Sequence, residues 1–123
     1  MKERRRRVGE LIRAEISNMI LRGIKDPRVG FVSITAVEMS PDLRYATVYY
    51  HVLGSEKDVK SSTAGLRSAK GYIRREIGKR LTLRYTPEVT FKYDDTLDKA
   101  WHLESVLKTV AEQDHELSDD EEV

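Results

Sequence analysis

The sequence predicts an α+β domain with the element order helix, strand, strand, helix, helix, strand, followed by one more helix at the C-terminal end. Apolar residues recur at three- and four-residue steps in residues 8–20, 66–81 and 100–110, which is typical of helices that bury one face. Apolar and polar residues alternate in residues 45–53 and 88–93, which indicates strands with one face in water. Because so small a sheet needs a packed face to be stable, we expect the helices to cover one side of it.

The N-terminal half predicts one helix and a hairpin. The helix is expected over residues 4–22, and Gly23 follows it as a helix stop. Residues 31–39 are rich in β-branched side chains and predict the first strand. Residues 40–43 have the composition of a turn, so residues 45–53 should return as an antiparallel second strand. The side chains expected on the buried face of this second strand are Ala46, Val48, Tyr50 and Val52.

The next segment opens with a helix cap. Ser55, with Asp58 three residues later, has the spacing of a capping box for a helix over residues 56–68. A further helix is expected to run to about Leu83 and to be followed by the third strand at residues 88–93.

Between these two helices we expect a kink formed by Ser68, Ala69, Lys70 and Gly71. A glycine in a helix interior costs roughly 1 kcal/mol relative to alanine, and it permits a bend. The small side chains of Ser68 and Ala69 would let another backbone come close.

The chain ends in a helix and an acidic segment. The helix is expected over residues 97–110, with Trp101 serving packing rather than binding. Its apolar side is expected to contain Ala100, Leu103, Val106, Leu107 and Val110. Residues 113–123 have little to bury and are expected to be disordered. We therefore predict a domain over residues 1–110 and a disordered acidic tail over residues 111–123.

Composition excludes several classes of protein. There is no cysteine, which rules out disulfides and thiolate metal sites and suits a reducing compartment. No apolar run is long enough to span a membrane, and the basic start leads into an amphipathic helix rather than a secretory signal. The net charge of +1 hides a division, because residues 1–93 hold 20 Lys and Arg against 10 Asp and Glu, whereas residues 94–123 hold 2 against 11. A basic body of this kind suits a polyanionic partner.

The cations gather around the expected kink, at the N-terminus and in the loop before the first strand. Phosphate contacts from such clusters give affinity with little sequence choice, so folded shape would supply the selectivity. The competing interpretation is that these side chains only solvate a helix face. The candidate nucleic-acid contacts are Arg67, Lys70, Arg74, Arg75, Lys79, Arg80, Arg84, Arg4, Arg5, Arg6, Arg7, Lys25 and Arg28.

Catalysis has little support. His51, His102 and His115 have no metal-ligand spacing with a carboxylate, so no cofactor or metal is expected. No serine lies in a recognisable nucleophile setting, and no loop of the nucleotide-binding type is present. Asp94, Asp95 and Asp98 could gather a divalent cation, although helix capping explains them more simply. Tyr45, Tyr49 and Tyr50 could stack bases; the alternative is cross-strand packing for Tyr45 and Tyr49 and a place in the core for Tyr50.

The element order resembles that of the type II KH domain, an RNA-binding module. The usual KH loop, Gly-x-x-Gly, is absent, and Ala69-Lys70-Gly71 occupies its place. This departure, together with the segments at residues 24–30, 37–43, 72–74 and 87–94, resembles the ribosome-binding factor A family over residues 4–110.

The resemblance implies a non-enzymatic, monomeric, cytoplasmic factor that needs no membrane or cofactor. It would bind the immature small ribosomal (30S) subunit through its ribosomal RNA and aid maturation of the RNA 5′ end and the decoding region, including during growth in the cold. A GTPase or an initiation factor would promote its release. The alternative is a protein-interaction module that docks through its sheet edge or first helix, with the basic face incidental. Salt separates the two interpretations, because phosphate binding weakens steeply with salt and apolar docking does not.

Overall fold

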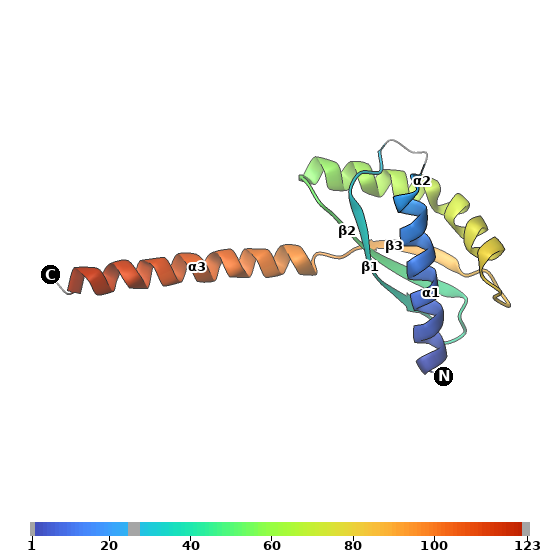
Figure 1. The fold of residues 1–123 in the computed structure, drawn as a ribbon, viewed down its shortest axis with the longest axis horizontal. Helices are drawn as coiled ribbons and strands as arrows, with labels where there is room; N and C mark the ends of the chain where they lie inside the picture. Colours follow the sequence, from blue (N-terminus) through green and yellow to red (C-terminus); the bar gives the residue numbers. More distant parts are fainter. Residues whose placement is uncertain (1, 25–27, 122–123) are drawn as a thin grey trace.

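A computed structural model describes residues 2–24 and 28–121, with side chains described for residues 2–24 and 28–111. The elements in chain order are α1 (Lys2–Leu21), β1 (Val32–Met39), β2 (Tyr45–Val52), α2 (Glu56–Arg80), β3 (Glu88–Tyr93) and α3 (Thr96–Glu121), as Figure 1 shows. The α+β class and the element order are confirmed, with the two expected middle helices joined in α2.

The three strands form one sheet in the order β1-β2-β3. β1 and β2 pair antiparallel, which confirms the expected hairpin. β2 and β3 pair parallel, because α2 carries the chain back across the sheet between them. The four side chains expected on the inner face of β2 are all buried, and Val48 at the centre of the sheet is fully buried between Val37 of β1 and Phe91 of β3.

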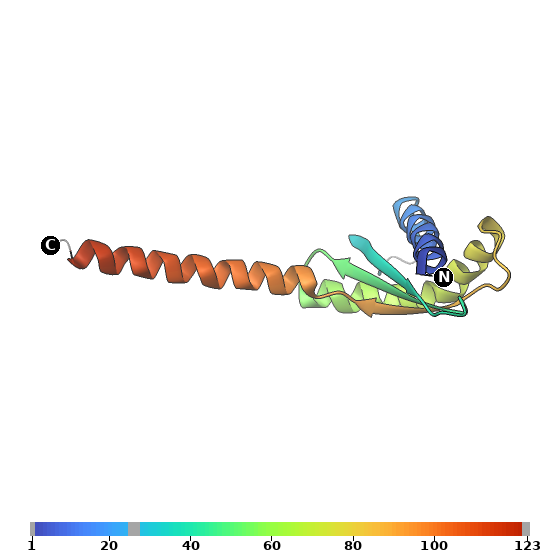
Figure 2. The same cartoon turned by 90° about the horizontal axis from the view of Figure 1, so that it is seen from below.

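One face of the sheet packs against α1 and α2, whose buried side chains belong to the same core as the inner residues of all three strands (Figure 2). Ile12 and Ile16 of α1 and Ile73 of α2 are fully buried in this core. α1 lies very close to β1, since a Cβ on Gly9 would stand only 2.7 Å from the carbonyl oxygen of Val37.

The first turn of α2 has the expected cap. The Ser55 side chain accepts a hydrogen bond from the Asp58 N–H, and the Ser55 N–H donates to the Asp58 carboxylate over 2.8 Å. From there α2 runs without interruption for 25 residues. Figures 1 and 2 both show its axis changing direction part-way along. The expected kink is therefore a bend within a continuous helix, and the expected break into two helices does not occur.

α3 differs from expectation in its length and its surroundings. It continues to Glu121, past the expected end at Val110, and Figures 1 and 2 show it leading away from the sheet. Its side chains from residue 97 to residue 111 are exposed, and Trp101 is 69% exposed. The expectation that Trp101 packs is wrong, because the chain passes from β3 into α3 without turning back over the core. The tail boundary after residue 110 and the disorder of the tail stay predictions.

No helix in the described part of the chain combines the length and the apolar character needed to cross a membrane.

Candidate nucleic-acid interface

An open groove of about 550 Å³ runs beside the second half of α2. It is lined by Gly71, Arg74, Arg75, Gly78, Lys79 and Thr86. Gly71 and Gly78 are seven residues apart, which is about two helical turns and places both on the same face of α2. Since neither residue has a side chain, the floor of this groove is helix backbone.

The two glycines serve different purposes. A Cβ on Gly78 would stand 2.9 Å from the Thr86 hydroxyl, so the segment before β3 packs directly on Gly78 and forms one wall of the groove. A Cβ on Gly71 would meet only the Arg75 guanidinium, at 3.6 Å. The end of the groove at Gly71 is therefore open to the approach of another backbone.

Three exposed cations lie within about one helical turn of Gly71, and one of them, Arg75, lines the groove itself. The side chains of Arg67, Lys70 and Arg75 make no hydrogen bond or ion pair with any residue that the structure describes. Their charge is not neutralised locally, so it is available to a phosphate backbone, whose bound counterions such cations displace.

Arg80, another expected contact, is engaged within the fold. Its guanidinium lies 3.2 Å from the Glu76 carboxylate and 3.5 Å from that of Glu15, with only 33% of the side chain exposed. Arg80 thus joins α2 to α1, and its main role is structural.

Arg74 and Lys79 are intermediate between the unpaired cations and the structurally engaged Arg80. Arg74 contacts the Glu88 carboxylate at 3.1 Å and donates to the Thr86 carbonyl over 3.4 Å. Lys79 lies 3.8 Å from Glu76. An exposed pair such as Arg74–Glu88 contributes only about 0–1 kcal/mol, so a phosphate could replace Glu88 as the partner of Arg74. The Lys79 side chain is 74% exposed and only loosely paired, so it too is accessible to a phosphate.

The small residues around the bend seat the chain's own loop. Arg28 donates to the Ser68 hydroxyl over 2.7 Å, and a Cβ on Gly65 would stand 2.6 Å from the Val29 side chain. Ala69 is buried in the core. The expectation that Ser68 and Ala69 receive an outside backbone is therefore wrong. The approach is blocked at these two residues and open slightly further along the helix, at Gly71.

The remaining candidates lie apart from the groove. Arg4, Arg5, Arg6 and Arg7 lie in the first turns of α1. The Arg84 guanidinium lies over the Tyr85 ring, 5.4 Å from its centroid. Lys25 lies outside the described residues.

Two parts of this site, Gly78 and Thr86, were not predicted from the sequence. The seven-residue spacing from Gly71 to Gly78 could have indicated Gly78, because it repeats a gap on one helix face. Thr86 carries no such signal, since its position depends on how the segment after α2 folds back.

The carboxylates near the start of α3 serve the fold. Asp94 accepts hydrogen bonds from the Thr96 N–H at 3.0 Å and the Thr35 hydroxyl at 2.7 Å, and hydrogen bonds from Thr96 and Thr35 hold its pKa at about 2. Asp98 accepts from the Tyr93 hydroxyl at 2.6 Å and lies 3.0 Å from the His51 ring nitrogen. Among the described residues, no group of three or more His, Cys, Asp or Glu side chains could hold a metal ion.

Comparison with known proteins places this fold in a family. Residues 4–107 match the family model described as ribosome-binding factor A. The chain belongs to this family. It is similar to the ribosome-binding factor A of Citrifermentans bemidjiense, with 55% identity over 114 residues that cover 93% of this chain and 96% of the relative.

Solved structures of the family share the fold. The solution structure of a Thermotoga maritima protein, described as a ribosome-binding factor A, is 36% identical with a TM-score of 0.61, over 69% of this chain and 81% of that one. A homology model of the Thermus thermophilus ribosome-binding factor A, fitted into a cryo-electron-microscopy map of a 30S complex, is 22% identical with a TM-score of 0.56, over 70% and 89% of the two chains. At that identity the second likeness shows the fold alone.

Proposed function

We propose that this protein is a non-enzymatic assembly factor that binds the immature small ribosomal subunit through its ribosomal RNA. The observation that carries the proposal is the set of unpaired cations, Arg67, Lys70 and Arg75, around exposed helix backbone at Gly71. Phosphate oxygens approach helix backbone closely only where no side chain intervenes, and free cations supply the affinity. Membership of the ribosome-binding factor A family supports a ribosomal partner, and the Thermus member of that family was fitted into a 30S complex.

The consequences of binding follow from the family. The factor would act as a monomer in the cytoplasm, aid maturation of the ribosomal RNA 5′ end and the decoding region, including in the cold, and leave when a GTPase or an initiation factor promotes its release. Selectivity would come from shape, because the groove and the separate basic turns of α1 lie on one domain and together fit a folded junction better than a plain duplex.

A complementation experiment tests this proposal. A bacterium that lacks the corresponding gene would carry the wild type, Lys70→Glu/Arg75→Glu, or Lys57→Glu/Lys60→Glu. The last pair is a matched control, because it makes the same charge change at exposed positions in the first half of α2. Primer extension would report the ribosomal RNA 5′ end during growth in the cold, and gradient sedimentation would report the protein on small subunits.

We expect the wild type and the control to sediment with small subunits and to restore the mature 5′ end, whereas the groove variant should do neither while keeping its circular dichroism spectrum. Full restoration by the groove variant would contradict the proposal. Subunit binding that salt does not weaken would favour protein docking through a sheet edge or α1 instead.

A further inference from the structure

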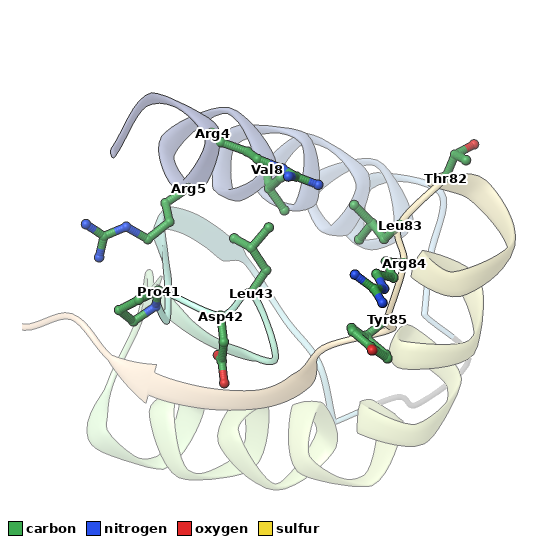
Figure 3. Close-up of a pocket in the computed structure, with 10 residues that line it drawn as sticks. All are labelled: Arg4, Arg5, Val8, Pro41, Asp42, Leu43, Thr82, Leu83, Arg84 and Tyr85. Atoms are coloured by element: carbon green, nitrogen blue, oxygen red, sulfur yellow. The ribbon is translucent and has the colours of Figure 1, made fainter. Parts of the chain in front are cut away.

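A second concave site adjoins the groove. It has a volume of about 270 Å³ and lies where the first turns of α1 meet the β1–β2 turn and the segment after α2. Figure 3 shows the residues that line it: Arg4, Arg5, Val8, Pro41, Asp42, Leu43, Thr82, Leu83, Arg84 and Tyr85. Tyr85 lines this pocket and the next residue, Thr86, lines the groove, so the two sites share one segment of chain.

The inner walls of the pocket are apolar. Figure 3 shows Val8, Leu43 and Leu83 pointing toward a common space. Leu43 has a φ of 61°, which is costly for a residue with a side chain, and the Leu43 N–H donates to the Ser40 carbonyl over 2.9 Å to hold this turn. The pocket, at about 270 Å³, is just below the range of about 300–1,000 Å³ typical of ligand sites, so it suits one ring system and not a longer segment.

The rim of the pocket is positively charged and includes an oriented planar group. Arg44 and Arg84 place their guanidinium carbons 4.5 Å and 5.4 Å from the Tyr85 ring centroid, so the ring holds both groups in place. Arg4 and Arg5 add charge at the N-terminal end of α1, where the helix itself favours an anion.

Asp42 is the one acid among the lining residues. Its carboxylate accepts hydrogen bonds from the Ser40 hydroxyl at 2.6 Å and the Arg44 N–H at 3.1 Å, so it is engaged in the turn. The lining therefore combines apolar walls, a planar guanidinium group and an excess of positive charge. Unpaired RNA bases are bound by such surfaces, where they stack on aromatic rings or guanidinium planes while nearby cations hold the adjoining phosphates.

We propose that this pocket receives one unpaired nucleobase of the RNA whose backbone lies in the α2 groove. The base would insert between the apolar wall at Leu43 and Leu83 and the guanidinium group of Arg84, with its phosphate at Arg4 and Arg5. This inference rests on the proposed function, and it adds a base contact to a site that otherwise reads only backbone and shape.

Chemical footprinting on small ribosomal subunits tests the pocket. Dimethyl sulfate and a carbodiimide would report base edges, and hydroxyl radicals would report the RNA backbone. Leu83→Trp fills the pocket without a change of charge, and Arg84→Gln removes the guanidinium group from an exposed position. Matched controls are Leu53→Trp, at an exposed leucine, and Arg22→Gln, at an exposed arginine just after α1.

We expect the wild type to change the reactivity of at least one base within its backbone footprint. Leu83→Trp and Arg84→Gln should lose that base signal, keep the backbone footprint at saturating protein, and bind about tenfold more weakly, as the loss of one stacked base predicts. Both controls should behave as the wild type.

Other outcomes would overturn the inference. A backbone footprint without any altered base, or a base signal that survives in both pocket variants, would exclude a nucleobase from this pocket and leave the groove proposal standing. Weaker binding by the pocket variants with an unchanged base pattern would place a protein side chain there instead. If the wild type did not bind small subunits at all, the proposed function itself would fail.

Discussion

Replacing Gly71 with alanine should make the protein more stable and a weaker RNA binder. Gly71 lies within α2 and has no positive φ, so alanine fits its backbone conformation. The added methyl group would meet only the Arg75 guanidinium at 3.6 Å, an ordinary van der Waals contact. Removing a helix-interior glycine should therefore raise the free energy of unfolding by about 0.5–1 kcal/mol, or the melting temperature by about 2–4 °C.

The same methyl group would stand on the floor of the groove, where a phosphate backbone is proposed to approach. We expect affinity for small subunits to fall about fivefold, which corresponds to about 1 kcal/mol. Urea unfolding followed by circular dichroism and co-sedimentation with subunits measure the two effects. Gly78→Ala is the control, because its methyl group would collide with Thr86 at 2.9 Å and should lower stability instead.

Two results would refute this reasoning. A less stable Gly71→Ala variant would show that the bend in α2 requires glycine for its conformation. An unchanged affinity would show that nothing approaches the helix backbone at Gly71.

Two further predictions concern the fold. Gly65→Ala should destabilise the protein by about 1–2 kcal/mol, because the added Cβ would stand 2.6 Å from the Val29 side chain and 3.2 Å from the Val29 nitrogen. This steric cost outweighs the gain in helix propensity from alanine. An unchanged urea midpoint would mean that the loop at Val29 does not pack on Gly65. Hydrogen bonds from Thr96 and Thr35 lower the Asp94 pKa from 3.8 to about 2, so the stability they contribute is present above about pH 4 and lost as the pH falls toward 2. The melting temperature of Asp94→Asn should therefore fall less steeply than that of the wild type in this range, and identical profiles would argue against the role of Asp94.

Local patterns in the sequence were sufficient to predict the elements that build the domain. The alternation of residues 88–93 predicted β3 with its observed bounds, and Ser55 with Asp58 predicted the cap of α2. These features depend on neighbours within a few residues of the sequence, so residue propensity and hydrophobic periodicity are sufficient to predict them. The parallel pairing of β3 with β2 depends on the path of α2 across the sheet, which no local pattern specifies.

The cluster of cations and the small residues among positions 68–71 are visible in the sequence, so they indicated where a candidate site could lie, whereas Gly78 and Thr86 were not predicted. From the sequence alone, Arg75 and Arg80 look equally available to a ligand. In the structure Arg75 has no partner among the described residues, whereas Arg80 forms an ion pair with Glu15 of α1, which is far away in the sequence. Likewise, the periodic apolar residues of α3 predicted a buried face, but periodicity does not specify a partner, and Trp101 is exposed. Whether a charged side chain is paired, or an apolar helix face is covered, depends on tertiary contacts that the sequence pattern does not specify.

The salt dependence of small-subunit binding tests the central claim most directly. Affinity would be measured from low to moderate salt for the wild type, Lys70→Gln/Arg75→Gln and Arg80→Gln. If Lys70 and Arg75 each neutralise one phosphate, their loss should reduce the slope of log affinity against log salt by about 1.5–2, whereas Arg80→Gln should run parallel to the wild type. Parallel lines for all three proteins would contradict the claim that the α2 groove holds the RNA backbone.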